Sequence, residues 1–229
     1  MNVRLAYLFV ALFIIHGCAS YQVTPALPLD YDLEAQNIKA EKDGVLLLAK
    51  PIHQIPELTK YFDDDFLKYG ILPIQIHIEN NEHEPALICA PEGINLMDPS
   101  NARIPALTVE QVMDKAKKSH WRAAGWTAQF GVFGLVPSII NVNNTNKKMR
   151  ADYETKLFNG GKIGKGSATD GFMFFSIPKD THSLDGWTLA AVLKGTDESE
   201  DLILKQALSG KIAIREKEGQ SQSSQTIDE

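Results

Sequence analysis

The stretch Ile71–Asn80, ILPIQIHIEN, decides the fold class of this chain. Isoleucines stand at positions 74, 76 and 78, and Gln75, His77 and Glu79 alternate with them. An apolar residue at every second position is the pattern of a β-strand, because successive side chains of an extended chain point to opposite faces. The stretch therefore predicts a strand whose isoleucines lie in the core of a β-rich protein.

Segments of similar composition lie on both sides of this strand, separated by turn residues. A first strand is expected at residues 44–52 (GVLLLAKPI), and one or two short strands are expected within residues 86–98 (ALICAPEGINLMD). Two further strands are expected at residues 170–178 (DGFMFFSIP) and 186–194 (GWTLAAVLK). The run EDLILKQAL is compatible with a strand or a helix, and KIAIREKE with a final strand.

Helical patterns interrupt the strands. Residues 56–70 (PELTKYFDDDFLKYG) predict a short helix with its three aspartates on a solvated face. Thr108 and Gln111 form a capping-box pattern at the start of a helix over residues 109–120.

A second helix is expected from about Thr145 to Phe158, because Gly160 and Gly161 follow as helix-ending residues. The sequence therefore predicts a helical insertion at about residues 108–158, between two groups of strands.

Residues 40–215 carry three motifs that together resemble a known kind of domain. The alternating strand ends in asparagine (ILPIQIHIENN), a later strand ends in Leu-x-Asp (INLMD), and a glycine-flanked turn leads into an aromatic strand (GKIGKGSATDGFMFFSIP). In these features the sequence resembles the immunoglobulin-like domain of many exported bacterial lipoproteins. The resemblance covers about half of the chain that remains when an N-terminal export signal is set aside. The resemblance implies a mainly β fold: an immunoglobulin-like β-sandwich with a helical, partly apolar insertion, α+β overall. It also implies binding and assembly in the envelope rather than catalysis.

The N-terminus has the composition of an export signal. A short polar start with the positive charge of Arg4 precedes an apolar run at residues 5–15, which is too short to span a bilayer comfortably. Residues 15–18, Ile-His-Gly-Cys, resemble the lipobox of bacterial lipoproteins: an aliphatic residue, a small residue and then the cysteine. His16 departs from the usual small residue at its position.

In that family the chain is cut before the cysteine, which then carries acyl chains such as palmitate. The resemblance implies a lipoprotein signal peptide at residues 1–17 and lipid attachment at Cys18. Because Ala19 stands where an aspartate favours the inner membrane, it also implies an outer-membrane lipoprotein that faces the periplasm. The alternative is a plain signal peptide or a short membrane anchor, in which the cysteine is incidental.

Charge and composition limit what the exported chain does. Cleavage before Cys18 removes one positive charge and no acidic residue, which changes the net charge from −6 to −7. A mildly acidic chain is poorly suited to nucleic acid, so no nucleic-acid partner is expected. With Cys18 lipidated, Cys89 has no disulfide partner, and its apolar surroundings predict a buried, inert thiol. Residues 18–39 are expected to form a tether, and residues 216–229 a disordered tail.

Residues 123–142 (AAGWTAQFGVFGLVPSIINV) contain no charged residue and have basic segments on both sides. An uncharged segment with basic flanks and nearby tryptophans is typical of a membrane contact. Its three glycines and Pro137 favour a re-entrant or hairpin-like loop over one straight helix. A glycine-rich protein–protein contact and an ordinary core layer are the alternatives. The candidate partner or membrane contacts are Trp121, Trp126, Phe130, Val132, Phe133, Leu135 and Val136.

No motif in the sequence supports catalysis or metal binding. The segment GGKIGKGSATDG lacks the spacing of a phosphate-binding loop. His77, Glu79 and His83 lack a fourth ligand and a known metal-site spacing. No nucleophile elbow or triad order is present. We therefore assign no catalytic residue, no metal ligand and no cofactor.

The sequence thus predicts a non-catalytic outer-membrane lipoprotein. We expect it to act as an interaction or structural subunit of a cell-envelope assembly, with envelope proteins as partners. The alternative is a periplasmic binding lipoprotein for a small or cell-wall ligand, with the sandwich loops forming its site.

Overall fold

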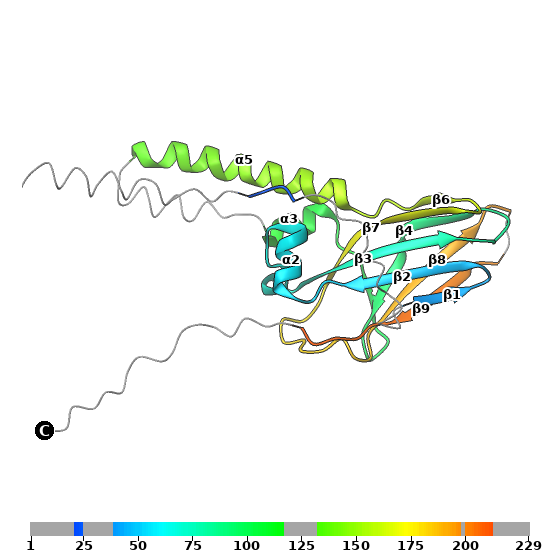
Figure 1. The fold of residues 1–229 in the computed structure, drawn as a ribbon. Helices are drawn as coiled ribbons and strands as arrows, with labels where there is room; N and C mark the ends of the chain where they lie inside the picture. Colours follow the sequence, from blue (N-terminus) through cyan, green and yellow to red (C-terminus); the bar gives the residue numbers. More distant parts are fainter. Residues whose placement is uncertain (1–20, 25–38, 117–131, 198–199, 213–229) are drawn as a thin grey trace, which may run out of the picture.

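The computed structural model describes residues 21–24, 39–116, 132–197 and 200–212, and of residues 132–142 it describes the backbone. In chain order the elements are β1 (Lys39–Lys42), β2 (Val45–Pro51), α2 (Ile55–Phe62), the 3-10 helix η1 (Phe66–Tyr69), β3 (Ile71–Asn80), β4 (Leu87–Met97), β5 (Arg103–Pro105), α3 (Val109–Ala116), α5 (Val132–Lys156), β6 (Gly161–Ile163), β7 (Ser167–Ser176), β8 (Thr188–Gly195) and β9 (Leu202–Ala207) (Figure 1).

The strands form two antiparallel sheets. The first has the order β1-β2-β3-β7, and the second has the order β5-β4-β8-β9, with β6 paired to β4 beside β5. Apolar residues of both sheets form one buried cluster, which includes Ile74, Ile76, Leu96 and Leu189. The prediction of a mainly β, α+β, sandwich-like fold is confirmed at this level. The ambiguous run at residues 200–208 contains a strand, β9.

The strand that decided the fold class is β3, and both of its faces are covered. Ile74, Ile76 and Ile78 are fully buried between the sheets, as the alternation predicts. Gln75 on the opposite face is also buried, and it pairs across the sheet with Phe172 of β7. Phe172 belongs to a second apolar cluster, outside the first sheet.

This second cluster joins the helices to the outer face of the first sheet. It contains residues from α2, η1, α3, α5, β3 and β7. Aromatic rings dominate it: the Phe62 centroid lies 4.8 Å from that of Phe172 and 5.0 Å from that of Phe66. The helices therefore add a third layer at one end of the sandwich, and the β1–β2 and β6–β7 turns lie at the other end (Figure 1).

One helix boundary agrees with the prediction from the sequence and another differs. At α3 the Thr108 N–H donates to Oε1 of Gln111 at 2.9 Å, and the Gln111 N–H donates to Oγ1 of Thr108 at 3.3 Å, which confirms the capping box. The three aspartates after α2 do not form the solvated face that we expected. Asp64 and Asp65 are buried, and Asp64 Oδ1 accepts a hydrogen bond from Lys68 Nζ at 2.8 Å.

The helix α5 begins earlier than predicted. It starts at Val132 rather than near Thr145, and it continues through Gly134 and Pro137. The expected re-entrant or hairpin-like loop is therefore wrong from Val132 onward. Gly134 and Pro137 both disfavour a helix, but they lie in its first two turns, and the buried side chains of Met149 and Tyr153 hold its last turns.

The residues that carry the family-like motifs make turns. The Asn80 side chain, at the end of β3, accepts from the His83 N–H at 2.8 Å and donates to the Ile163 carbonyl oxygen at 3.2 Å, which ties β3 to β6. Asp98, after β4, accepts hydrogen bonds from the N–H groups of Ser100 and Ala102, each at 2.8 Å. The Ser100 hydroxyl donates to the same oxygen at 2.6 Å, and this bond, followed by the backbone bonds, lowers the pKa of Asp98. The motif residues therefore have structural roles.

The Gln206 side chain, from the second sheet, bonds to the backbone of β2 in the first sheet, just beyond the point where β1 ends its pairing with β2. Within the described residues, β1 pairs with β2 from Val45 to Leu48. At the next position Gln206 of β9, which is buried, accepts from the Ala49 N–H at 2.9 Å and donates to the Ala49 carbonyl oxygen at 2.7 Å. The amide group thus takes both backbone groups that a further strand would bond.

Gly160 and Gly166 have similar positive φ angles, +65° and +71°, in different surroundings. A Cβ atom at Gly160 would lie 2.1 Å from the carbonyl oxygen of Cys89, whereas one at Gly166 would have no heavy atom within 4 Å. We expect Gly166→Ala to lower the free energy of unfolding by about 1–2 kcal/mol, the effect of the left-handed backbone alone. Gly160→Ala adds a backbone clash and should lower it by about 2–5 kcal/mol. Urea unfolding of both variants tests this, and equal losses would show that the close approach is unimportant.

Candidate functional site

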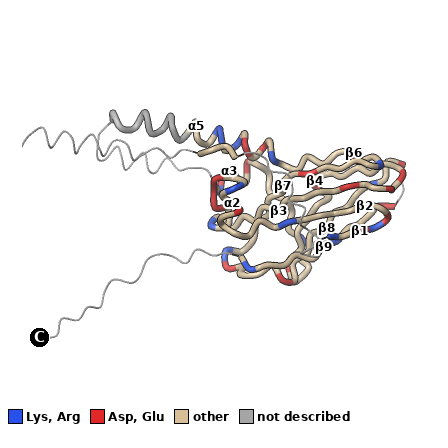
Figure 2. The backbone as a smooth tube through the Cα atoms, viewed as in Figure 1, with Lys and Arg blue, Asp and Glu red and all other residues tan. Residues whose placement is uncertain are grey.

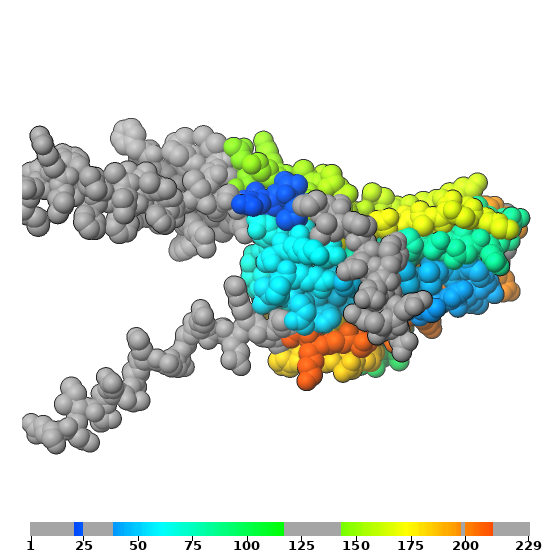
Figure 3. Space-filling view, viewed as in Figure 1, coloured from blue at the N-terminus to red at the C-terminus, as the bar shows by residue number. Residues whose placement is uncertain are grey.

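Residues 21–24 pack against the helices, although the sequence placed them in a tether. Tyr21 is buried, and its ring meets that of Tyr153 edge-on, with 6.0 Å between centroids. Its hydroxyl donates a hydrogen bond of 2.5 Å to Oδ2 of Asp152 on α5. Figure 3 shows the segment in blue, between α2 and α5. We call residues 21–24 and their partners on α2 and α5 the N-terminal docking site.

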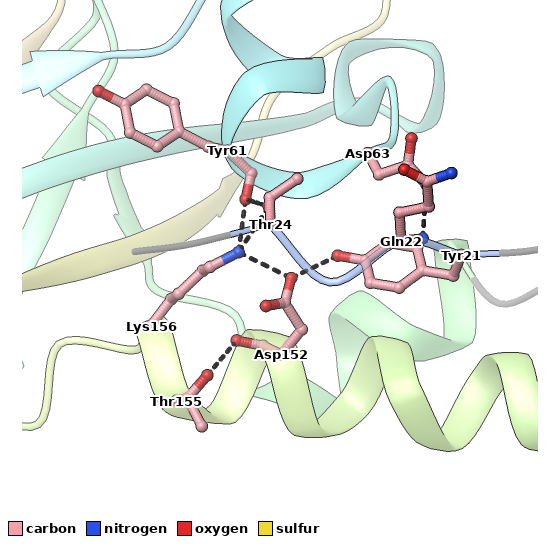
Figure 4. Close-up of polar contacts among 8 residues, drawn as sticks. All are labelled: Tyr21, Gln22, Thr24, Tyr61, Asp63, Asp152, Thr155 and Lys156. Atoms are coloured by element: carbon pink, nitrogen blue, oxygen red, sulfur yellow. Dashed lines mark hydrogen bonds and ion pairs between the residues drawn. The ribbon is translucent and has the colours of Figure 1, made fainter. Parts of the chain in front are cut away.

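Lys156 lies at the centre of this site (Figure 4). Its Nζ donates to Oδ2 of Asp152 at 2.8 Å, to the Tyr61 carbonyl oxygen at 2.6 Å and to Oγ1 of Thr24 at 2.8 Å. The Thr24 hydroxyl donates to the same carbonyl oxygen. All three protons of the ammonium group are therefore used. The side chains of Lys156 and Asp152 are each only 1% exposed.

The end of α2 holds the backbone of the segment. The Gln22 N–H donates to Oδ2 of Asp63 at 2.8 Å. Asp63 ends α2 in the left-handed conformation, with φ of 49°, which turns its side chain toward the segment (Figure 4). Val23 is different from its neighbours, because its side chain is 61% exposed. Hydrogen bonds thus hold Tyr21, Gln22 and Thr24, and Val23 faces outward.

The electrostatics of the site fit a structural role. Asp152 and Lys156 are four residues apart in α5, so their side chains lie on the same helix face. Burial lowers the pKa of Lys156, and the bond to Asp152 opposes that effect. Burial, and then the hydrogen bond to Asp152, raises the pKa of Tyr21. The Tyr21 phenol therefore keeps its proton and donates it to the Asp152 side chain, which also accepts from Lys156, and this arrangement holds the chain in place.

The predicted contact residues lie partly outside the described residues. Cys18, Trp121, Trp126 and Phe130 are outside, and so are the predicted signal peptide and tail. The others, Val132, Phe133, Leu135 and Val136, belong to the first turns of α5. Figure 1 shows that this part of α5 leads away from the sheets, on the side of the molecule where the helices lie. The structure therefore brings the beginning of α5 and residues 21–24 to the same end of the domain.

Sequence reasoning missed the N-terminal docking site. The spacing of Asp152 and Lys156 was visible within the predicted helix, and such a pair is a common surface feature. Nothing in the sequence indicated that both side chains are buried or that Tyr21, 131 positions earlier, covers them.

A second feature is a cleft of about 610 Å³ between β4, β5, the start of α3 and the end of α5. Its apolar lining includes Ile94, Leu107, Leu157, Phe158 and Met173. Glu110 and Glu154 also line it, and Nη1 of Arg150 lies 2.5 Å from Oε1 of Glu110 and 3.8 Å from Oε1 of Glu154. The N–H of Glu110 itself and the Arg150 guanidinium lower the pKa of Glu110. The cleft has the size of a small-ligand site.

In the part of the chain that the structure describes, no group of three or more His, Cys, Asp or Glu side chains is placed to hold a metal ion. His77 Nε2 lies 3.8 Å from Oε2 of Glu79, and Nδ1 of His83 lies 3.0 Å from the Pro85 carbonyl oxygen. Among the described helices, none has the length and apolar character to cross a membrane. Figure 2 shows Lys and Arg interspersed with Asp and Glu over the described residues.

Cys89 is a buried free thiol, as predicted, with 1% of its surface exposed. Burial raises its pKa from 9.0 to about 12. Because the folded-state pKa is the higher one, the burial of this thiol favours folding fully below pH 9 and progressively less as the pH rises toward 12.

The thiol of Cys89 is expected to resist modification in the folded protein. In a Cys18→Ser chain at pH 8, Ellman's reagent should react with Cys89 at least about 100-fold more slowly in buffer than in guanidinium chloride, because the thiolate is suppressed and covered. Rapid, complete reaction in buffer would contradict this description of the core.

Comparisons with known proteins add little to this geometry. No family model and no curated protein matches the chain. Among solved structures it is similar to the crystal structure of the yjhA protein from Bacillus subtilis, with 13% sequence identity, coverage of 72% of this chain and 93% of that chain, and a TM-score of 0.34. A similarity of this degree supports no inference about the site.

Proposed function

We propose that this chain is an outer-membrane lipoprotein that faces the periplasm and acts, without catalysis, as an interaction or structural subunit of a cell-envelope assembly. The anchor is the acylated Cys18. The proposal is supported most by one observation: residues 21–24, which begin three positions after Cys18, and the start of α5 lie at the same end of the domain (Figure 1). An anchor at that end presents α5 where envelope partners meet the membrane.

The contact element in this proposal is the first part of α5. Residues 132–142 are helical and contain no charged residue. A helix that is apolar on all sides is stable when protein or lipid covers it. Val132, Phe133, Leu135 and Val136 are therefore the partner contacts we propose, and Trp121, Trp126 and Phe130 extend that set along the sequence.

We also propose that the two-sheet domain is immunoglobulin-like. The support is the match between the three sequence motifs and the turns they make at Asn80, Asp98 and Gly166. In such domains the sheets form a rigid framework, and specificity lies in loops and insertions. This agrees with our proposal that the inserted helix α5 contacts the partner.

Photo-crosslinking in cells tests the partner contact. The full chain would carry benzoylphenylalanine at Phe133 or, as the matched control, at Ile203 of β9, whose side chain is also apolar and is 46% exposed. A discrete adduct with an envelope protein at Phe133, absent at Ile203, is the expected result. No protein adduct at Phe133, or the same adducts at both positions, would refute the proposed partner contact.

The anchor is tested separately by Cys18→Ser. We expect the variant to remain uncleaved or to be released in soluble form, and to lack the mass of the acyl groups. If it still fractionates fully with membranes, lipid on Cys18 is not the anchor.

The cleft favours a second candidate function, a periplasmic binding lipoprotein for a small or cell-wall ligand. Its volume of about 610 Å³ and its mainly apolar lining, with a few charged side chains such as Glu110 and Glu154, fit this function. Muropeptides would be titrated against the full domain and against a Leu107→Trp variant that fills the cleft. Binding to the wild type that the variant loses supports this function, and equal binding to both excludes the cleft.

A further inference from the structure

We propose that the N-terminal docking site fixes the orientation of the domain on the lipid surface, with the end formed by α2, η1 and α5 facing the membrane. This inference rests on the proposed attachment of lipid at Cys18. In place of a tether over residues 18–39 it leaves three residue steps between the anchor and the fold, and it makes residues 21–24 a positioning element rather than a spacer.

The first step is the length of chain between the anchor and the fold. Three residue steps separate Cys18 from Tyr21, which span at most about 11 Å when extended. A free tether over residues 18–39 would reach about 75 Å when extended. Docking of residues 21–24 therefore reduces the reach of the domain about sevenfold.

The second step is that the contacts of residues 21–24 are buried, so that breaking them is costly. The Tyr21 hydroxyl and Thr24 Oγ1 both bond to members of a buried ion pair, and the pair members are each 1% exposed. If residues 21–24 left the site, Lys156 would lose one acceptor and Asp152 would lose one donor in a buried place. Leaving buried charged groups without hydrogen bonds is unfavourable, so the segment stays docked while the domain is folded.

The third step is which surface this places against the lipid. Tyr21 and Gln22 contact α5 and the end of α2, so the anchor emerges beside these helices. Val23, in the same segment, is the most exposed of the large apolar side chains in the described residues. From the same end the backbone of α5 leads outward, and the helix carries no charge before Lys147. The exposed apolar side chain of Val23 beside an acyl anchor suits a lipid surface, and the uncharged start of α5 then lies where a membrane-bound protein partner would meet it.

The test uses Cys18 as a chemical handle. A chain that begins at Cys18 keeps every described contact, and buried Cys89 leaves Cys18 as the single reactive thiol. The protein would be coupled through Cys18 to phosphatidylcholine vesicles that contain a maleimide lipid. Each variant must first show a cooperative thermal unfolding transition.

Lysine labelling then reports orientation. Lys60 is exposed on α2, at the end that we place against the lipid. Lys165 is 54% exposed in the turn between β6 and β7, beside the Asn80 end of β3. The ten residues of β3 span about 33 Å between the two ends. We expect vesicle attachment to slow acetylation of Lys60 by about threefold or more, because it lies near an anchor with about 11 Å of reach, and to leave Lys165 unchanged.

Three variants separate orientation from simple attachment. Tyr21→Ala removes the ring contact with Tyr153 and the hydrogen bond to Asp152, which lie nearest to the anchor, and should abolish the difference between Lys60 and Lys165. Gln22→Ala is the matched control, because Gln22 contributes its backbone N–H, and it should keep the protection of Lys60. Ten Gly/Ser residues inserted after Ala19 leave the docking site intact, lengthen the reach by about 35 Å and should also abolish the difference.

Equal labelling of Lys60 and Lys165 in the attached wild type would overturn the inference. So would protection of Lys60 that persists in both Tyr21→Ala and the insertion variant. Since the lipid is attached chemically, these results are independent of acylation in cells. If Cys18→Ser still fractionates with membranes, the proposed anchor is wrong, but the orientation measured on vesicles stands. If the vesicle experiment shows no orientation, the inference is wrong, but the proposed anchor stands.

Discussion

Asp152→Ala is expected to lower the free energy of unfolding by about 3–5 kcal/mol, because it leaves the Lys156 ammonium buried without its charge partner. The same change removes the acceptor for the Tyr21 hydroxyl. Urea unfolding at pH 7 measures the loss. Proteolysis at residues 18–24 should also become faster, because Tyr21 loses its hydrogen bond to Asp152.

The matched control for this result is the double variant Asp152→Ala, Lys156→Met. Removing both charges leaves no buried ion, so the double variant should recover to within about 1–2 kcal/mol of the wild type. If single and double variants were equally unstable, the loss would come from packing rather than from the unpaired charge.

Phe62→Ala is expected to lower the free energy of unfolding by about 3–5 kcal/mol. Phe62 is fully buried, and its ring lies 4.8 Å from that of Phe172, 5.0 Å from that of Phe66 and 6.1 Å from that of Tyr153, centroid to centroid. Removing this ring opens a cavity at the junction of α2, η1, α5 and the first sheet. Thermal and urea unfolding measure the effect.

Phe62→Leu keeps most of the apolar volume and should lower the stability by less than about 1.5 kcal/mol. The Lys156 ammonium lies 5.4 Å from the Phe62 ring centroid, so the alanine variant should also loosen residues 21–24. If Phe62→Ala lost no more stability than Phe62→Leu, the second cluster would not be a packed core.

The sheet framework could be predicted because it rests on local patterns. The alternation in β3 marks one buried face, and turn residues such as Asn80 and Asp98 delimit the strands. The second cluster could not be predicted in this way. Phe172 and Phe174 of β7 read as strand residues, and only the chain topology shows that helices cover that face.

The candidate site and the nearby turn after α2 were also less predictable, because the burial of their polar residues is not visible in the local sequence. Asp64 reads as a surface acid, and it is buried because η1 folds Lys68 back onto it. Tyr21 reads as part of a spacer, and it is ordered by a helix that begins more than a hundred residues later. A local turn buries Asp64 and a contact 131 positions along the chain orders Tyr21, and the composition of neither segment indicates this.

The amide of Gln206 has a consequence for how copies of this domain meet one another. Exposed strand edges invite neighbouring chains to add their own strands. By bonding both backbone groups of Ala49, Gln206 removes one place where this addition would begin. A second copy of the domain therefore cannot extend the first sheet by pairing a strand at Ala49.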